Sequence, residues 1–473
     1  MLKIKSRPLF LLTILFLLLS SFSTAASNGG SFYGTTEETE TEISGVLKPE
    51  LRVFADDGEL NENLKGNLEI NYPGKTHEFQ FLLDFQPGAV EEIEIDELYY
   101  QYYGEQYNFL VGKDRPVWGK GDQLHVVDNL NGEDLSDFIN QDYKDRQIGE
   151  EMIKINRYFR GGNANLEFIY TPDFTPNRMA DNPESRLGNW VINPFAAQIP
   201  LANIAMATGQ TETEIINQVE DSIPEEKNQF ALRFTDSRGS TDYGFSYYQG
   251  YLREPSYDLM GLNTSLTNNP IESPNNLAEI EENKNNFKKA LTAADLHYDQ
   301  VDIFGFELAR VIADINSRFE LAYYRTDDTD GNDPTVRNNK IAWVIGGDRD
   351  LPISNLNLNL QFRGQKILDD DQIENNILSG QADLEYNQEG DYTTNRAVLK
   401  LEDSYQNEKI IPQLSWVYNL NDQDYILEAA VDYELKQDLV LTLSHKIFAG
   451  DKDTSFGQFE DNDYSTAALN YKF

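Results

Sequence analysis

The sequence predicts an all-β fold: a transmembrane antiparallel β-barrel of roughly 16–18 strands, with short periplasmic turns and long external loops. Three observations predict it. Segments of about ten residues alternate between apolar and polar side chains. The connections between them alternate between short and long, and the longest apolar run lies at the amino-terminus. A chain that crosses a membrane without apolar helices must use strands that close into a barrel, because open strand edges in lipid leave backbone groups unpaired.

The amino-terminus has the pattern of a cleaved secretory signal. Lys3, Lys5 and Arg7 precede an almost unbroken apolar run over residues 8–19, and small residues follow over 21–26. The apolar run is shorter than the ~20 residues that a membrane-spanning helix needs. We therefore predict a signal peptide over 1–26, a short lead over 27–42 and a single barrel over 43–473.

Candidate strands follow along the rest of the chain. They number nineteen, whereas single-chain bacterial barrels have even strand numbers, so at least one is wrong, and residues 380–420 are the weakest region. The segments are 47–53, 63–72, 76–86, 92–103, 106–113, 150–160, 164–171, 228–236, 241–253, 299–313, 316–326, 339–348, 355–364, 380–388, 393–403, 408–419, 424–435, 438–448 and 463–473.

The connections between these strands favour a barrel over a soluble sandwich. Tight turns follow the second, fourth, sixth and eighth strands, whereas long loops over 114–149, 172–227 and 254–298 follow the fifth, seventh and ninth. A barrel with short periplasmic turns and long external loops produces this rhythm. A sandwich has comparable strand spacing but no reason to hold every long loop at one end.

The amino-acid composition further restricts the kinds of site and function that this protein can have. The chain has no cysteine, so it contains neither disulfides nor thiolate metal sites. Its formal net charge of −41 argues against nucleic-acid binding, because phosphate contacts require the opposite sign. A mean hydropathy of −0.56 remains compatible with a membrane barrel, in which only alternate strand residues meet lipid.

Charge is costly in hydrocarbon, so each strand should turn its apolar side to lipid and its charged side to the lumen. In the strand predicted over 228–236, Phe230, Leu232 and Phe234 face lipid, which places Arg233 inside. The same reasoning assigns these residues to the lumen: Lys154, Arg318, Glu320, Arg396, Lys400, Glu402 and Lys446. A wet lumen with charges of both signs suits a diffusion channel. The alternative is that these charges pair with one another and only solvate the wall.

The loop over 114–149 has the most individual sequence. A Gly-Lys-Asp-Arg-Pro-Val-Trp-Gly-Lys-Gly-Asp run over 112–122 is followed by an Asp/Asn cluster over 128–134. This segment is similar to one in porin-type barrels of diderm bacteria. In general porins the loop at this position folds back into the lumen, so the resemblance implies a constriction. We expect Lys113, Arg115 and Lys120 to oppose Asp122 and Asp128 there. Otherwise 114–149 is an ordinary surface loop anchored by Trp118.

The carboxy-terminus alternates as a strand and ends on an aromatic residue. Leu469, Tyr471 and Phe473 share one face of the last segment. This resembles the closing strand of outer-membrane barrels, in which such a terminus is the assembly signal. The resemblance implies outer-membrane lipid and the barrel-assembly machinery as partners, and a homotrimer is one assembly that it allows.

The sequence therefore predicts an outer-membrane porin: a water-filled channel for passive diffusion of small polar solutes or ions, with no cofactor, no metal and no enzymatic activity. A barrel hydrolase would need a catalytic pair, and Ser444 and His445 face opposite ways as strand neighbours. Residues 326–331 do not match an EF-hand calcium loop. The alternative function is an adhesive or structural barrel that acts through its long acidic loops.

Overall fold

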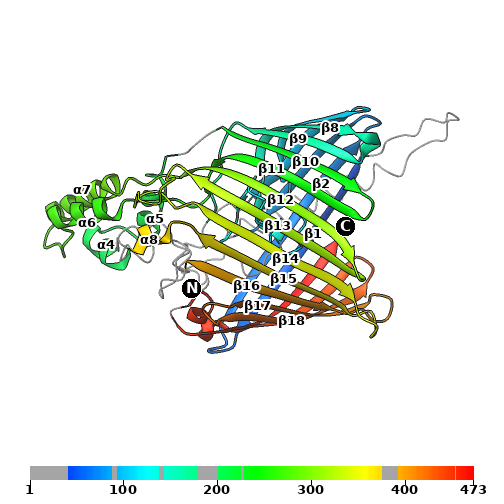
Figure 1. Ribbon diagram of the computed structural model, residues 1–473. Coiled ribbons are helices and arrows are strands. Elements are labelled where there is room, and N and C mark those ends of the chain that lie inside the picture. The colour runs from blue at the N-terminus through cyan, green and yellow to red at the C-terminus, as the bar shows by residue number, and fades with distance from the viewer. Residues whose placement is uncertain are drawn as a thin grey trace, which may run out of the picture.

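Eighteen antiparallel strands pair in chain order and close into a barrel in the computed structural model, which describes residues 41–87, 93–137, 143–178, 201–224, 228–374, 392–452 and 454–473 (Figure 1). The strands are β1 (Glu42–Phe54), β2 (Leu60–Pro73), β3 (His77–Phe85), β4 (Ile93–Tyr103), β5 (Tyr107–Asp114), β8 (Glu150–Phe159), β9 (Ala164–Thr171), β10 (Gln229–Arg238), β11 (Thr241–Tyr251), β12 (Gln300–Ile312), β13 (Ile315–Thr326), β14 (Lys340–Asp350), β15 (Asn357–Ile367), β16 (Thr393–Glu402), β17 (Ile410–Asn419), β18 (Tyr425–Lys436), β19 (Leu439–Ala449) and β20 (Tyr464–Lys472).

The barrel closes where the last strand meets the first. β20 pairs with β1 as well as with β19, and β1 pairs on its other edge with β2. At the seam, Gly45 and Phe473 exchange backbone hydrogen bonds of 3.1 Å in both directions. The predicted all-β barrel and its closing carboxy-terminal strand are confirmed. The use of that strand as an assembly signal stays a prediction.

One predicted strand has no counterpart among the described strands. β15 pairs directly with β16 in register from Asn357–Glu402 to Lys366–Thr393, so 18 strands close the barrel without residues 380–388. That segment lies outside the described residues, as does the predicted signal peptide over 1–26. The other predicted strands each overlap an observed strand. Two short strands that the prediction lacked, β6 (Gly132–Glu133) and β7 (Gln147–Ile148), form a separate two-stranded sheet within loop 115–149.

The outer face of the barrel is apolar. Phe230 and Leu232, predicted to face lipid, are 40% and 42% exposed, as expected for side chains that have no protein over them. Aromatic residues on this face pair across strands, as Phe245 does with Phe306 at 5.2 Å between ring centroids. A closed barrel satisfies its backbone hydrogen bonds internally, so an apolar exterior of this kind can face lipid. The chain is an outer-membrane barrel.

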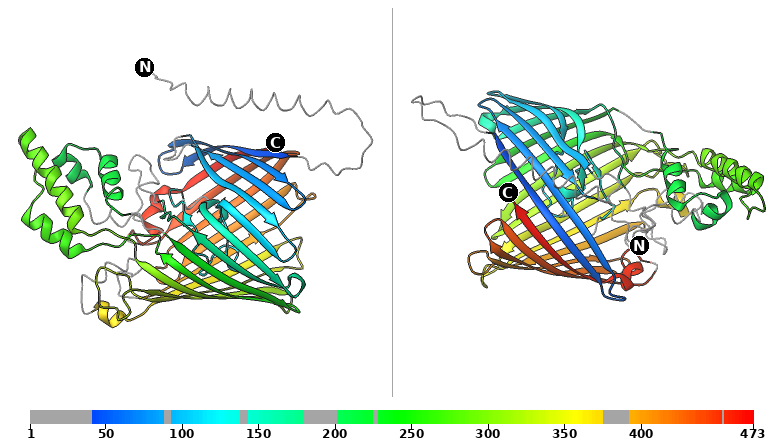
Figure 2. Two further views of the ribbon diagram at one scale, coloured as in Figure 1. Left: turned by 90° about the horizontal axis from the view of Figure 1, so that it is seen from above. Right: turned by 180° about the vertical axis from the view of Figure 1, so that it is seen from behind.

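The two ends of the barrel differ. At the end where β1 begins and β20 ends, the connections include two-residue turns such as Ala313–Asp314, with φ of 51° and 62°, as a tight hairpin turn requires. All the long loops lie at the opposite end, which we call the external end (Figures 1 and 2).

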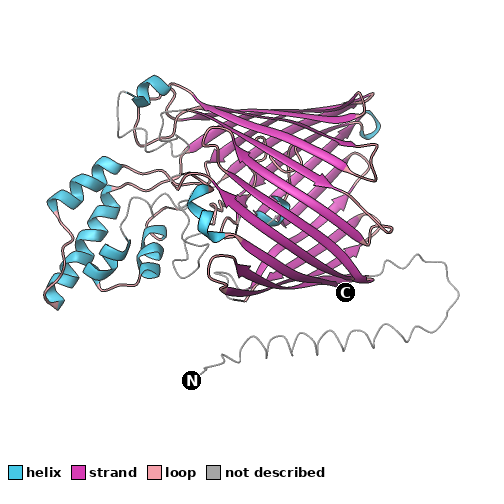
Figure 3. Ribbon diagram, turned by 90° about the horizontal axis from the view of Figure 1, so that it is seen from below, coloured by secondary structure: helices cyan, strands magenta, loops and turns pink. Residues whose placement is uncertain are grey.

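Four helices from two external loops project beyond that end (Figure 3). They are α4 (Leu201–Thr208), α5 (Glu212–Glu220), α6 (Leu259–Asn268) and α7 (Leu277–Ala293), and we call them the helical cap. Their apolar faces share a core that includes Ile215 and Phe287, each at most 1% exposed. A capping box between Thr211 and Glu214 starts α5. No helix among the described residues is long and apolar enough to cross a membrane.

Candidate functional site: the lumen and its inward-folded loop

Loop 115–149, between β5 and β8, folds into the lumen and packs against the inner wall. Trp118, Val126 and Val127 are at most 3% exposed and share a core with inward-facing residues of β5 and β8–β14. The wall has room for them because its side chains are small there. Ser246, Gly305, Ala322 and Ala342 are aligned in register across β11–β14. A Cβ atom at Gly305 would lie 2.9 Å from Val127 Cγ1, so a larger residue would displace the loop.

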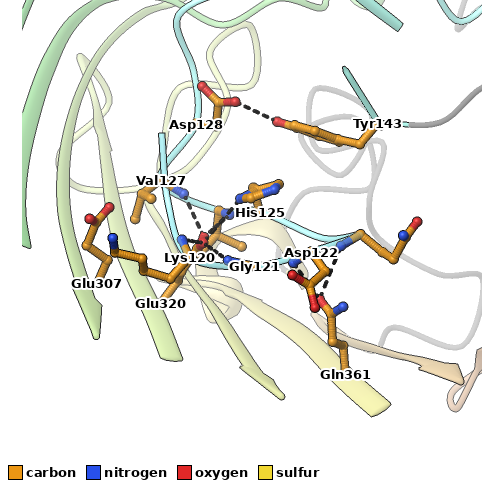
Figure 4. Close-up of polar contacts among 12 residues, drawn as sticks. Lys120, Gly121, Asp122, His125, Val127, Asp128, Tyr143, Glu307, Glu320 and Gln361 are labelled. Atoms are coloured by element: carbon orange, nitrogen blue, oxygen red, sulfur yellow. Dashed lines mark hydrogen bonds and ion pairs between the residues drawn. The ribbon is translucent and has the colours of Figure 1, made fainter. Parts of the chain in front are cut away.

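A single carboxylate on β13 holds the loop backbone. Glu320 is fully buried, and its Oε1 accepts hydrogen bonds from the backbone N–H groups of Lys120 at 2.6 Å and Gly121 at 2.7 Å. Its Oε2 accepts from the N–H groups of Val126 at 2.8 Å and Val127 at 3.4 Å (Figure 4). The buried charge of Glu320 is thus satisfied by backbone donors that would otherwise be unpaired.

Two glycines allow the backbone to approach this carboxylate so closely. Gly119 has φ of 109°, and a Cβ atom there would lie 2.3 Å from Glu320 Oε1. A Cβ atom at Gly121 would lie 1.9 Å from the carbonyl oxygen of Leu124. The Gly-Lys-Gly run of the sequence is therefore the part of the loop that wraps around Glu320.

The far part of the loop reaches a different part of the wall. Asp137 accepts a bidentate pair of hydrogen bonds from Arg52 of β1, at 3.2 and 2.7 Å, and lies 3.5 Å from Lys65 Nζ of β2. β1 is eight strands from β13 around the barrel, counted through β14 to β20. In a barrel of 18 strands, a separation of nine strands is diametrically opposite, so β1 and β13 lie on nearly opposite walls. The loop therefore crosses the lumen and is tied at both sides.

The three basic residues predicted to line a constriction are in different environments. Lys113 is the second-to-last residue of β5, and its Nζ lies 3.9 Å from Glu94 at the external end of the wall. Arg115 is paired with two carboxylates of β4, Asp96 at 2.8 Å and Glu97 at 3.1 Å. Lys120 contributes its backbone N–H to Glu320. Lys113 and Arg115 are thus paired with the wall rather than opposed to acids of the loop.

The two predicted acids also have partners. Asp122 Oδ2 accepts hydrogen bonds from Arg318 of β13 at 2.7 Å and from Asn359 of β15 at 2.6 Å. Asp128 accepts a hydrogen bond of 2.9 Å from the Tyr143 hydroxyl. Burial raises the pKa of Asp128 to about 6, although the nearby charge of His125 and the Tyr143 hydrogen bond act in the opposite direction. Lys113 and Arg115 pair with wall carboxylates, and Asp122 pairs with Arg318 and Asn359, so these three residues do not pair with one another. Their role in a constriction stays a prediction.

Three of the remaining predicted lumen residues, Lys154, Lys400 and Arg233, form ion pairs along the wall. Lys154 Nζ lies 2.5 Å from Asp114, and Lys400 Nζ lies 3.3 Å from Glu402. Arg233 lies 2.6 Å from Glu307, and its guanidinium covers the Trp118 ring at 5.7 Å. Their inward placement follows the sequence prediction, and pairing among wall residues is the arrangement that the sequence left as its alternative.

Several contributors had no signal in the sequence. Arg253, which follows β11, donates to Glu150 of β8 and to the carbonyl oxygens of Leu130 and Thr175, and so joins three segments at the external mouth. Asp137 lies in an acidic stretch with no periodicity that would distinguish it. The Glu320 carboxylate was placed inside by alternation, but its role in holding the loop was not predicted.

Comparison with known proteins gives one assignment. The chain belongs to the family described as "Protein of unknown function (DUF1302)". The family model matches residues 51–473, which include nearly the whole barrel.

Solved outer-membrane structures show only a distant likeness to this DUF1302 chain. Similar structures include Salmonella typhi OmpF in complex with daunomycin (7% identity, 92% of this chain and 97% of that one, TM-score 0.41). They also include Pseudomonas aeruginosa OccK11 (OpdR), with 9% identity over 92% of this chain and 96% of that one and a TM-score of 0.46. OccD3 (OpdP) from the same organism has 8% identity over 92% of this chain and 91% of that one and a TM-score of 0.45. No curated protein matches the sequence. The description of the fold therefore depends on the strand pairing of this chain itself.

Proposed function

We propose that this DUF1302 protein is an outer-membrane channel for passive diffusion of small polar solutes or ions, with loop 115–149 setting the width of the passage. The observation that carries the proposal is the double attachment of the loop, to Glu320 on one side of the lumen and to Arg52 on the other. A loop held at two walls narrows a barrel of this size without a separate plug domain.

The polar residues that follow on β2 and β3 give the lumen wall the chemistry of a wet surface. Polar side chains occupy the lumen face of β2 and β3, where Asn71 donates to Glu78 at 2.7 Å and to Gln80 at 2.9 Å, and Gln80 donates to Glu69 at 2.7 Å. Amides and carboxylates of this kind hydrate a pore without binding apolar solutes. We assign the protein no catalytic activity.

Conductance in a planar lipid bilayer tests the proposal. The purified, heat-modifiable barrel should produce stepwise ion currents in potassium chloride, and neutral polyethylene glycols of increasing size should reduce the current only below a cut-off radius. A barrel that inserts but carries no current would contradict the proposal.

A second candidate function is adhesion or partner binding by the external loops. The helical cap favours it, because the cap has its own apolar core and projects away from the barrel. Proteolytic removal of the cap from the folded protein distinguishes the channel function from the adhesive function. A channel should keep its current after cap removal, whereas an adhesive protein should lose binding to its surface.

A further inference from the structure

Two arginines on the inner wall face each other, and neither forms an ion pair with a carboxylate of the described residues. Arg363 of β15 and Arg396 of β16 are directly opposite in register. Both point inward, because Phe362 and Leu399, on the alternate positions of these strands, belong to the apolar side. Like charges at directly opposed positions destabilise a strand pair, so this arrangement needs an explanation.

The other lumen arginines of the described chain show what is unusual about this pair. Arg52, Arg115, Arg233, Arg253 and Arg318 each form an ion pair with at least one carboxylate. Among the described residues, neither Arg363 nor Arg396 has an ion pair with a carboxylate. The chain has 80 acidic and 39 basic residues, so acidic residues are in excess overall, yet none of those that the structure describes forms an ion pair with these two arginines.

Neutral groups hold the two guanidiniums instead. Arg396 Nε donates to the amide oxygen of Asn419 at 2.7 Å, and its guanidinium lies 5.4 Å from the centre of the Phe456 ring. Arg363 donates to the amide oxygen of Gln365 at 3.4 Å. Stacking and a single hydrogen bond orient Arg396 while leaving its other N–H donors for a ligand.

Asp424, an acid near Arg396, has other hydrogen-bond partners. Asp424 is fully buried, with Oδ1 accepting from the Asn419 amide at 2.7 Å and Oδ2 from the Phe456 backbone N–H at 2.6 Å. It holds the residues that support Arg396 and forms no ion pair with Arg396 itself. Arg146 of loop 115–149, which pairs with Glu133 at 3.4 Å, lies close enough to act on Arg396 electrostatically, and so do the acids Asp424 and Asp422.

The pair also lies beside the narrowed part of the lumen. Gln361, two residues before Arg363 on the same face, is 3.4 Å from the backbone N–H groups of Asp122 and Gln123 in the inward-folded loop. A solute that passes the loop on this side therefore comes within reach of the arginines.

We propose that Arg363 and Arg396 form an anion-binding site on the lumen wall, which takes the carboxylate or phosphate group of a permeating solute. The planar fork of guanidinium donors matches both groups, and two such forks favour a dianion. This inference rests on the proposed channel function, because it names the class of solute that the channel would take up.

Isothermal titration calorimetry on the folded barrel in detergent tests the site without requiring a pore. Succinate and inorganic phosphate are the two anionic probes, and succinamide is the neutral control. Wild-type protein should bind at least one anion and not succinamide. The double variant Arg363→Gln/Arg396→Gln should bind at least tenfold more weakly. The matched control Arg349→Gln, on the outward face of β14, should bind as wild type does.

The outcomes are distinguishable. If the barrel conducts but binds neither anion, or if the double variant binds as tightly as wild type, the anion site is refuted and the channel stands. If it binds anions through these arginines but carries no current, the channel is refuted and the site stands. Heat-modifiable migration reports folding. Should the double variant not fold, Arg363→Gln alone, which removes a single 3.4 Å hydrogen bond, provides the test.

Discussion

Loop 115–149 and the helical cap begin from similar material and end on opposite sides of the barrel mouth. Both arise from long external loops that are rich in acidic and amide residues. Loop 115–149 places its apolar residues, such as Trp118 and Val127, against small residues of the wall, so it folds inward. The cap places Ile215 and Phe287 against other helices, so it builds its own core outside. The direction of a loop is thus set by where its few apolar residues find partners and not by its overall polarity.

The two regions also differ in how their backbone polar groups are satisfied. The cap uses helices, which hydrogen-bond their own backbone. Loop 115–149 contains little regular structure, and four of its N–H groups depend on Glu320. The inward loop should therefore be sensitive to single wall residues, whereas the cap should be sensitive only to its own core. The predictions below test this contrast in order of their expected effect on ion current.

The largest effect is expected from Glu320→Ala. It leaves up to four backbone N–H groups without an acceptor, and each unsatisfied buried group costs about 1–3 kcal/mol. The loop should leave the wall, and single-channel conductance should rise several-fold with frequent fluctuations. Glu402→Gln, an inward glutamate that pairs with Lys400, is the matched control and should leave the current near that of wild type. Equal currents for Glu320→Ala and wild type would show that the loop does not narrow the passage.

A smaller effect is expected from Arg52→Ala, which removes the attachment on the opposite wall. Asp137 keeps Lys65 at 3.5 Å, so the loop should loosen only at its far part. Conductance should increase, but less than for Glu320→Ala. A double-mutant cycle with Asp137→Ala measures the coupling of the pair, and strictly additive effects on conductance would contradict the proposed attachment.

The third prediction concerns pH. Burial lowers the pKa of His125, but its hydrogen bond of 3.2 Å to Glu320 and that residue's charge outweigh burial, so the pKa lies above its usual value of 6.5. Because the pKa of His125 is raised when loop 115–149 is packed against the wall, packing of the loop is coupled to binding of a proton. The stabilisation of the packed loop by protonated His125 is complete below pH 6.5 and is lost as the pH rises through the raised pKa.

Ionisation of Asp128 also weakens packing of the loop as the pH rises, but over a lower pH range than that of His125. Its pKa is raised from 3.8 to about 6, so its ionisation opposes docking as the pH rises between these values. Current fluctuations should therefore increase above pH 6.5 in wild-type channels. His125→Gln should show a much flatter pH dependence there. The same pH dependence in both proteins would exclude His125 as its source.

The smallest effect on current is expected from Phe287→Ala in the cap. Removing this buried ring should destabilise the cap core by about 3–5 kcal/mol. Limited proteolysis should then cleave the cap more quickly, while single-channel conductance stays unchanged. A change in conductance comparable to that of Arg52→Ala would show that the cap and the inward loop act as one unit.

Several features of this protein could be predicted from the sequence because they depend on local periodicity. A period of two identifies strands and separates the lipid face from the lumen face, so Phe230 and Arg233 were placed on opposite sides without any knowledge of neighbours. The alternation of short and long connections identified the external end. Only the candidate over 380–388 exceeded the 18 strands, in a polar stretch where the alternation is weak.

The partners of the lumen residues were decided by the tertiary structure alone. Asp122 meets Arg318 and Asp137 meets Arg52 across 196 and 85 residues of chain, and Trp118 donates to Glu167 of β9 at 2.6 Å. No local sequence pattern predicts contacts between residues so far apart in the chain, because barrel closure and strand register determine which inward side chains lie at the same height along the barrel axis. The sequence by itself therefore determined which residues face the lumen. Closure of the wall and the inward fold of loop 115–149 decided which of those charges are neutralised and which, like Arg363 and Arg396, are left without an acidic partner among the described residues.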